Sequence, residues 1–264
     1  MQLAFWQIVV LAIVQGITEF LPISSDGHLV VVSQLLAPGQ DLDQFVELNV
    51  VLHMGTLGSI LVYYWRHILR LLGEDRRLIG LIVAGTIPAV VIGLPLRFFG
   101  EHILASPLLA GLMLPVTGGL LILASHFQRS TQQDYQTLSL RQALYIGTAQ
   151  ATALLPGISR SGTTISAGLL LGLSPRAATT FSFLLALPAI AGAGVLETIK
   201  MLGEQSESQH LPAPWLFGGA VTSFGVGLAA ITLLVRMLER NRLHWFAWWC
   251  IPLGISVVIW QLSK

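Results

Sequence analysis

The chain has 264 residues, of which 54% are hydrophobic and 10% are charged, and its formal net charge is +1. A soluble globular domain carries about a quarter charged residues, so this composition excludes an ordinary soluble protein, and the near-zero net charge gives no basic face for nucleic acid. One cysteine, Cys250, excludes an internal disulfide framework and gives no metal-site spacing.

The chain begins with an apolar segment, 1–37, that is interrupted by Gln15, Glu19 and Pro22. It lacks the basic start and the small-residue cleavage site of a signal peptide, so we expect it to be retained. Six runs of about 20 mostly apolar residues, the length that crosses a bilayer, are Val46–Trp65, Leu78–Leu96, Pro107–Ser125, Thr179–Lys200, Pro214–Arg236 and Trp245–Leu262. A second interrupted segment, 142–177, lies between the third run and the fourth. We therefore predict an all-α integral membrane protein with six transmembrane helices.

The loops between these runs differ in charge. Segments 66–77, 126–141 and 236–244 contain Arg66, Arg70, Arg76, Arg77, Arg129, Arg141, Arg236, Arg240 and Arg242. Segments 38–47, 97–106 and 200–213 are poor in cations and contain Asp41, Asp43, Glu47, Arg97, Glu101, Lys200, Glu204 and Glu207. The positive-inside rule puts the first set in the cytoplasm and the second outside. Each interrupted segment must then enter and leave on one side, which predicts two re-entrant helical hairpins.

The two interrupted segments resemble each other at a constant offset of 135 residues. The identical pairs are Gln15/Gln150, Ile23/Ile158, Ser24/Ser159 and Gly27/Gly162. We predict a single membrane domain, 1–264, made of repeat 1 (about 1–127) and repeat 2 (about 138–264). A hairpin plus three crossings per repeat makes the repeats antiparallel, and in such inverted-topology repeats paired helix breaks indicate the binding site.

The first break, QGITEFLPISSDGH at 15–28, supplies the predicted reacting groups. Gln15 and Glu19 are four residues apart and share one helical face. A carboxylate inside a membrane is costly unless it is paired or hydrated, so Glu19 is a functional candidate; the alternative is a hydrogen-bonded Glu that serves packing.

The residues that follow in this break are small and polar. Ser24 and Ser25 stand where an N-cap would start the next helix, and Gly27 lets a ligand approach the backbone. His28 comes on the first turn, close in sequence to Glu19. Because His is the usual general acid or base near neutral pH, we expect it to be functional rather than a core histidine.

The second break, PGISRSGTT at 156–164, supplies the opposite charge. Arg160 is the basic residue of this apolar stretch, and its planar fork suits phosphate oxygens. A helix start built from small residues, including Gly162, leaves backbone N–H groups free and forms an anion site. Alternatively, Arg160 merely neutralises Glu19, since buried charges need partners. Together the breaks predict a phosphate-binding site that can carry out phosphoryl transfer.

At these motifs the chain resembles the undecaprenyl-diphosphate phosphatase family, the bacitracin-resistance membrane phosphatases of bacterial cell-wall lipid recycling, and the resemblance covers nearly the whole chain. It implies hydrolysis of undecaprenyl diphosphate to undecaprenyl phosphate and phosphate, with Mg²⁺ or Ca²⁺, by a fold of six crossings and two re-entrant hairpins. It also implies a multi-pass protein of the bacterial plasma membrane, with the site facing the periplasm or cell exterior.

The resemblance implies roles for single residues. Gln15 and Glu19 would bind metal or take part in catalysis, and Ser24, Ser25 and His28 would lie at the scissile phosphate. The diphosphate would be bound by Ser159, Arg160, Ser161 and Thr164. Asp26 stands where the family more often has Ser or Thr; it either helps to hold the metal or repels the substrate, and we do not count it as catalytic.

Several points stay open at this level. The nucleophile is Ser25 or a water molecule activated by Glu19 or His28. We expect His53 to have a core or supporting role, since it has no nearby acid in sequence. The tryptophans gather toward span ends and are interpreted as interfacial anchors: Trp6, Trp65, Trp215, Trp245, Trp248, Trp249 and Trp260. The oligomeric state is open, a homodimer included.

The competing functional class is a transporter or flippase of an anionic lipid, because inverted repeats with helix N-termini at an anion site are also the layout of carriers. A carrier needs the anion clamp but no nucleophile and base, so the set of Glu19, Ser25 and His28 favours the enzyme. A purely structural scaffold would leave the intramembrane Glu, His and Arg without a purpose.

Overall fold

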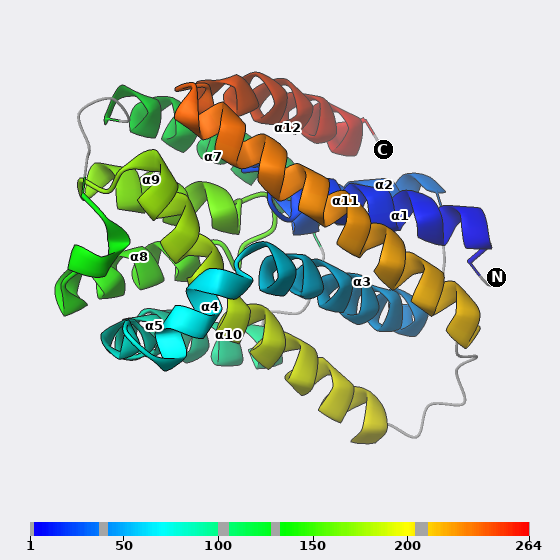
Figure 1. The fold of residues 1–264 in the computed structure, drawn as a ribbon. Coiled ribbons are helices and arrows are strands. Elements are labelled where there is room, and N and C mark those ends of the chain that lie inside the picture. Colours follow the sequence, from blue (N-terminus) through cyan, green and yellow to red (C-terminus); the bar gives the residue numbers. More distant parts are fainter. Residues whose placement is uncertain (1–2, 37–41, 100–105, 128–132, 204–210, 264) are drawn as a thin grey trace.

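The computed structural model describes residues 3–36, 42–99, 106–127, 133–203 and 211–263, and this part of the chain folds as an all-α protein (Figure 1). Its helices are α1 (Phe5–Thr18), α2 (Ser25–Leu36), α3 (Leu42–Tyr63), α4 (Trp65–Leu72), α5 (Arg76–Phe99), α7 (Pro107–Phe127), α8 (Leu140–Thr152), α9 (Arg160–Leu170), α10 (Pro175–Gly203), α11 (Ala213–Glu239) and α12 (Ala247–Leu262). Two short 3-10 turns are η1 (Tyr135–Thr137) and η2 (Leu243–Phe246).

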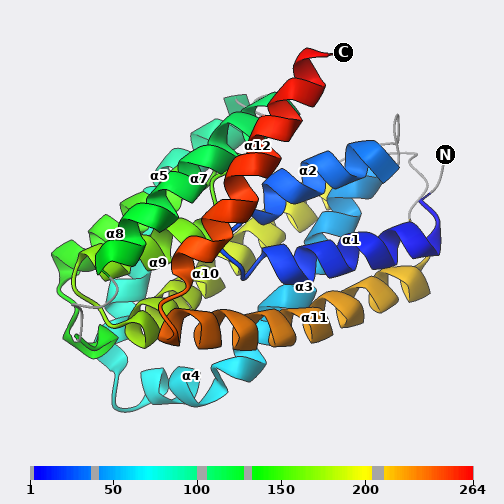
Figure 2. The same cartoon turned by 90° about the horizontal axis from the view of Figure 1, so that it is seen from above.

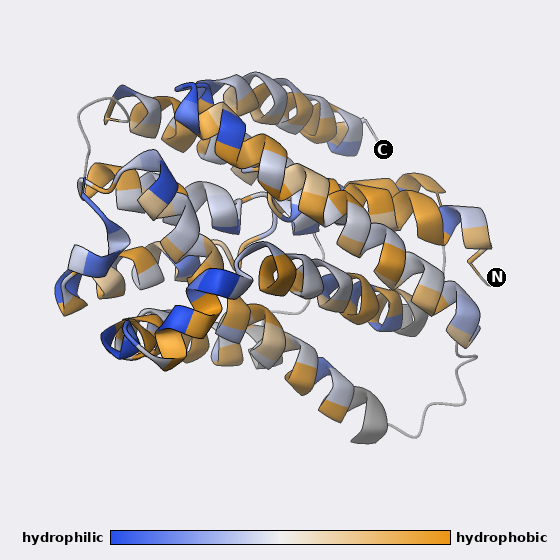
Figure 3. Ribbon diagram, viewed as in Figure 1, coloured by the Kyte–Doolittle hydropathy of each residue, from blue (hydrophilic) through white to orange (hydrophobic). Residues whose placement is uncertain are grey.

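Six helices in the described residues are long and apolar enough to cross a membrane, as predicted. Their spans are Phe45–Tyr63, Arg76–Leu96, Pro107–Phe127, Pro175–Ile199, Ala213–Glu239 and Leu243–Leu262. Figure 3 shows that these helices are largely pale to orange, whereas strong blue gathers toward the end of the molecule at α4. The bounds differ most at the fourth span, which begins at Pro175 and not at Thr179. Trp65 was predicted in the first span but belongs to α4, because Tyr64 (φ −101°, ψ 16°) leaves the helical region and ends α3.

Part of the charge pattern used for the topology falls outside this description. Residues Asp41, Glu101, Arg129, Glu204 and Glu207 lie outside the described residues, and the side chains of Asp43, Arg97 and Lys200 lie outside the description as well.

Four short helices, α1, α2, α8 and α9, have 14, 12, 13 and 11 residues and are shorter than a membrane crossing. Figure 2 shows α1 and α2 side by side, with the break between them turned to the middle of the molecule. The first helix of each predicted hairpin, α1 or α8, ends before the proline that we expected to end it. α1 ends at Thr18 and α8 at Thr152, each four residues before Pro22 or Pro156, because a proline ring clashes with the carbonyl of residue i−4.

The helices that follow the breaks begin where we expected. α2 begins at Ser25, and α9 begins at Arg160 with Ser159 as its N-cap. Each break contains one residue in the left-handed region, Ser24 (φ 72°) and Gly157 (φ 92°). Such backbone is rare for a residue with a Cβ, so Ser24 is held there by its surroundings.

Close helix packing fixes both breaks in the core. A Cβ at Gly16 of α1 would lie 2.9 Å from the carbonyl oxygen of Ser223 in α11, and a Cβ at Gly147 of α8 would overlap the carbonyl oxygen of Gly85 in α5. Phe20 in the first break is fully buried, and its ring meets that of Phe183 edge-on at 5.5 Å. The polar residues around Phe20 are therefore held deep in the protein.

Candidate active site

Glu19 is the centre of the polar cluster. It caps the C-terminus of α1, and its side chain is buried. One carboxylate oxygen, Oε1, accepts a hydrogen bond from Nη2 of Arg160. The other, Oε2, accepts from the Ser25 hydroxyl at 2.7 Å and from the Gln15 amide at 3.1 Å. The structure thus brings the acid of the first break to the cation of the second.

Ser24 joins the two breaks through the backbone. Its hydroxyl accepts hydrogen bonds from the N–H of Gly27 at 3.3 Å and from the N–H of Gly157 at 3.1 Å. A Cβ at Gly27 would lie 3.1 Å from the backbone of Gly157, so both glycines permit this approach. Ser24 therefore holds the backbone of the site together, and its contact with phosphate stays a prediction.

The hydroxyls of the second break organise the start of α9. Ser159 accepts from the N–H of Gly162 at 3.1 Å and lies 3.2 Å from the Ser161 hydroxyl, which in turn donates to the carbonyl of Leu21 at 3.3 Å. Thr117 of α7 accepts from the N–H of Ser159 at 3.1 Å and donates to the carbonyl of Gly157 at 2.8 Å. The first N–H groups of α9 have no partner within the helix and supply positive potential there.

Arg160 lies on the first turn of α9, and its guanidinium contacts the end of α1 and α10. Besides Glu19, its guanidinium donates from Nη1 to the carbonyl of Ala186 in α10 at 3.5 Å. The Thr164 hydroxyl bonds to the Arg160 carbonyl at 2.8 Å and lies 2.5 Å from the Ser182 hydroxyl. Thr164 thus fixes the helix turn that carries Arg160. The Arg160 side chain keeps 19% of its surface exposed, so further N–H donors can meet an anion.

His28 lies apart from this cluster. Its Nδ1 is 2.7 Å from the Ser24 carbonyl oxygen, and its Nε2 accepts from the indole N–H of Trp249 in α12 at 2.8 Å. Because the indole can only donate, His28 is neutral here with its proton on Nδ1. The two rings are nearly parallel, with centroids 6.2 Å apart. Both nitrogens of the predicted acid–base residue are therefore occupied, and Trp249 does more than anchor the span.

His53 is the imidazole that does meet Glu19, which sequence reasoning missed. Its Nε2 lies 3.6 Å from Glu19 Oε2, while its Nδ1 is held 2.8 Å from the carbonyl oxygen of Asn49 one turn earlier in α3. The side chain is 21% exposed. Of the two roles expected for His53, core or supporting, this position agrees with the supporting one. A histidine in an apolar span was the available signal, but its acid lies 34 residues earlier and only packing brings them together.

Asp26 follows Ser25 on α2, and its side chain is exposed. It lies within electrostatic range of His53, Glu19 and Arg160. Asp26 is therefore a second acid near the charged groups of the site, on its outer side.

Residues 8–256 match the family model described as bacitracin resistance protein BacA. The chain belongs to the BacA family. Its relatives include proteins called undecaprenyl-diphosphatase. The one from Rhodopirellula baltica is 52% identical over 97% of this chain and 98% of the relative. Those from Mycobacterium ulcerans and Desulfatibacillum aliphaticivorans are each 36% identical, over 97% and 96% of this chain and 96% and 97% of the relative.

The cation expected for a BacA-family protein can be tested against the donors at Glu19. Within the described residues, no three His, Cys, Asp or Glu side chains form a group that could hold a metal ion. The Gln15 amide, however, donates from its nitrogen to Glu19, and its buried oxygen has no hydrogen-bond partner in the described residues. Mg²⁺ keeps several waters and takes one or two carboxylates plus phosphate oxygens. Glu19 and Gln15 therefore fit a hydrated cation that arrives with a phosphate.

The BacA-family site combines the parts of a phosphoryl-transfer centre. A serine hydroxyl donates to a carboxylate, a guanidinium neutralises that carboxylate from the other side, and two helix N-termini converge on the same place. Serine activated by an adjacent base is a common nucleophile, and cationic donors stabilise the charge of a transferring phosphoryl group.

Proposed function

We propose that this chain hydrolyses undecaprenyl diphosphate to undecaprenyl phosphate and inorganic phosphate, and so recycles a carrier lipid of cell-wall synthesis and gives bacitracin resistance. The observation that carries the proposal is the chain of contacts from the Ser25 hydroxyl through Glu19 to Arg160. It unites a nucleophile, a base and a phosphate-binding cation in one buried site. The names of the relatives and the family support the same activity.

In this proposal, Ser25 attacks the terminal phosphorus while its proton passes to Glu19 Oε2. The bond from that phosphorus to the bridging oxygen breaks, and the lipid leaves as its monophosphate after the bridging oxygen takes the proton from Glu19. Water then attacks the phosphoserine, Glu19 takes a proton from the water and returns it to Ser25, and phosphate is released. Direct attack by a water molecule, with Glu19 as its base, uses the same groups without a phosphoserine.

Arg160 and the N-terminus of α9 would bind the diphosphate. Nη2 already contacts Glu19 and Nη1 contacts Ala186, so the remaining N–H groups are the ones that take phosphate oxygens. Gly162, at the start of α9, lets the diphosphate approach the backbone. Ser159 and Ser161 hold the loop in shape for it. A divalent cation, Mg²⁺ or Ca²⁺, would be held by Glu19 and the Gln15 amide oxygen and would neutralise phosphate charge.

We further propose that the fold is an inverted-topology repeat in one membrane domain, repeat 1 at about 1–127 and repeat 2 at about 138–264, with α1–α2 and α8–α9 as re-entrant hairpins. Reciprocal packing supports this: α1 packs on α11 of the other half, and α8 packs on α5 of the other half. The halves differ in chemistry. Gln150 matches Gln15 at the offset of 135, but Leu154 stands where the first half has Glu19.

We place the protein in the bacterial plasma membrane with the site open to the periplasm or cell exterior. The arginine-rich loops on the α4 side support a cytoplasmic face there. Glu19, Ser25 and Arg160 all come from one chain, so the proposed reaction works in a monomer or in a homodimer.

The test is phosphate release from undecaprenyl diphosphate by purified protein in detergent, with and without a chelator, for wild type and Glu19→Ala. We expect release by the wild type, less with chelator, and almost none from Glu19→Ala. Because detergent provides no sealed membrane, a transporter or flippase would release no phosphate. Absence of release from well-folded wild type would refute the enzyme.

A further inference from the structure

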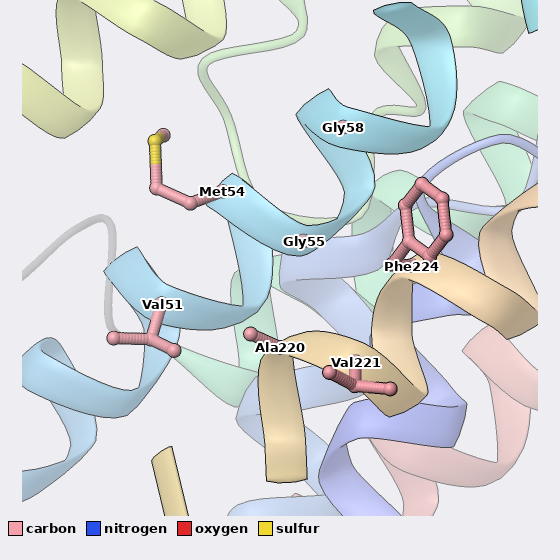
Figure 4. A pocket seen from close by; sticks show the side chains of 7 residues that line it. All are labelled: Val51, Met54, Gly55, Gly58, Ala220, Val221 and Phe224. Atoms are coloured by element: carbon pink, nitrogen blue, oxygen red, sulfur yellow. The ribbon is translucent and has the colours of Figure 1, made fainter. Parts of the chain in front are cut away.

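Two apolar hollows flank Met54 on α3. The α3/α11 hollow, about 340 Å³, is lined by Val51, Met54, Gly55, Gly58, Ala220, Val221 and Phe224 (Figure 4). The α3/α10 hollow, about 290 Å³, is lined by Met54, Ala191, Gly194, Val195, Thr198 and Ile199. Figure 4 shows the Met54 side chain pointing away from α11. The two hollows therefore lie on opposite sides of this residue.

The α3/α11 hollow is closed at its base. The Ser59 hydroxyl of α3 donates to the carbonyl of Phe224 at 2.8 Å, and the Ser223 hydroxyl of α11 donates to the carbonyl of Leu52 at 3.0 Å. A Cβ at Gly55 would overlap both Ser223 and the carbonyl of Ala220. The two backbones are thus in direct contact, so this hollow is a depression over a sealed seam.

The α3/α10 hollow is closed by one flexible side chain. A Cβ at Gly194 would lie 2.6 Å from the terminal methyl of Met54, so the methionine lies directly over this glycine. Within the described residues, no serine hydroxyl joins α3 to α10 as Ser59 and Ser223 join α3 to α11. The two helices are held near α4, where the ring of Tyr64 meets Phe183 at 5.8 Å. From there they separate toward the C-terminal end of α10 (Figure 1).

Both helices that border this hollow also carry a residue that contacts the polar site. On α3, Met54 follows His53, whose Nε2 faces Glu19. On α10, the carbonyl of Ala186 accepts from Arg160, and the hollow begins at Ala191, about 7–8 Å further along the helix. The helices that border this hollow are therefore the ones that contact the two charges of the site.

We propose that the polyprenyl chain of the lipid substrate leaves the active site between α3 and α10, and that Met54 is the side chain that moves aside for it. The inference rests on the proposed function. A diphosphate bound to Arg160 must stay among polar groups, while its apolar chain is stable only against apolar surface or lipid. Methionine is unbranched and flexible, and the glycine opposite leaves room for a chain once the methyl group moves.

The test fills one hollow at a time. Gly194→Leu and Val195→Trp fill the α3/α10 hollow, and Val221→Trp is the matched control in the α3/α11 hollow. For undecaprenyl diphosphate we expect KM to rise about tenfold or more in the first two variants and to change less than about twofold in the control. A water-soluble diphosphate without a long chain, such as isopentenyl diphosphate, should be hydrolysed by all three at wild-type rates, which also reports that the variants fold.

A second measurement locates the chain directly. An undecaprenyl diphosphate analogue with a photoreactive diazirine on its first isoprene units should label peptides from 191–199 of α10 and Met54, and labelling should fall in Gly194→Leu. Labelling of 220–224 instead, or a KM increase in Val221→Trp alone, would overturn the proposal, as would unchanged KM in both filling variants. If wild type hydrolyses neither substrate, the proposed function fails, which is a distinct result.

Discussion

The buried carboxylate of Glu19 pairs with the guanidinium of Arg160, 141 residues further along the chain. This pair joins the two helix breaks, and each partner stabilises the other in a place where a lone charge would be costly. Because the Ser25 hydroxyl bonds to the same carboxylate, the ion pair also sets the position of the proposed nucleophile.

Two replacements of Arg160 should distinguish the effect of its positive charge from the effect of its planar guanidinium. We expect Arg160→Ala to lower kcat/KM for undecaprenyl diphosphate about 100-fold or more and to lower the unfolding temperature, because it leaves Glu19 unpaired. Arg160→Lys should restore stability better than activity, since an ammonium lacks the planar fork. Arg176→Ala, at an exposed pair 4.0 Å from Glu239, is the control and should change little. Full activity of Arg160→Ala would show that the clamp is misassigned.

Ser25 decides between the two chemical routes. If it is the nucleophile, Ser25→Ala should abolish turnover and rapid acid quenching of wild type should trap a phosphoserine on Ser25, detectable by mass spectrometry. Ser33→Ala, on the same helix and bonded to the Val30 carbonyl at 3.1 Å, should leave activity unchanged. Residual turnover in Ser25→Ala with no phosphoserine in wild type would favour direct attack by water.

The two histidines should differ in their effects. His53 faces Glu19, so we expect His53→Gln to lower kcat about tenfold or more with little change in KM. His28→Gln should cost less, because both ring nitrogens are already bonded to the Ser24 carbonyl and to Trp249. The reverse order would mean that His28 leaves Trp249 when substrate binds. In that case Trp249→Phe, which removes the bond, should raise activity or leave it intact.

Gly157 should be intolerant of a side chain. Its φ of 92° suits glycine, and a Cβ would overlap the carbonyl oxygen of Ala110 in α7. We expect Gly157→Ala to destabilise the protein by about 3 kcal/mol and to lower activity, because the Ser24 contact between the breaks would shift. Gly119→Ala has open space around the new methyl group, so it should be neutral or slightly stabilising. Thermal unfolding in detergent and phosphate release measure both effects.

His67 in α4, outside the membrane spans, should contribute to acid sensitivity. Burial, with Arg70 and Arg176 nearby, lowers the pKa of its imidazole. A histidine whose folded pKa lies below the unfolded value of about 6.5 resists protonation when folded, so stability is full above that value and falls as the pH drops below it. We expect the unfolding temperature of the wild type to fall between pH 7.5 and 5.5, and that of His67→Gln to fall less over the same range. An equal fall in both proteins would contradict this, and His126→Gln, at an exposed residue near the end of α7, is the control.

Much of the fold followed from local chemistry. The six spans were predictable because crossing a bilayer requires a run of apolar residues, which is a property of each segment alone. The starts of α2 and α9 were predictable from Ser and Gly residues after a proline. The ends of α1 and α8 were misplaced by four residues, because the i−4 clash of a proline acts backwards along the helix.

The candidate site was predictable in part. Glu19 and Arg160 stand out because a charge in an apolar segment is expensive and needs a reason. His53 did not stand out, since its partner is distant in sequence and the two meet through the packing of α3 beside the first break. Likewise, nothing local indicated that Trp249 of α12 would hold His28, or that Ser24 and Thr164 would bond to protein groups.

The order of residues alone determines a membrane protein with six spans and two broken segments, with the acidic Glu19 at one break and the cationic Arg160 at the other. This is possible because length, hydropathy and proline geometry act within short stretches. Which groups meet is decided by how the helices pack. Close contacts at Gly16 and Gly147 press each broken segment against a helix of the other half. That packing joins Ser25, Glu19, His53 and Arg160, and it leaves the α3/α10 hollow at Met54. Such contacts were not predictable from the sequence, because they depend on distances that no local pattern encodes.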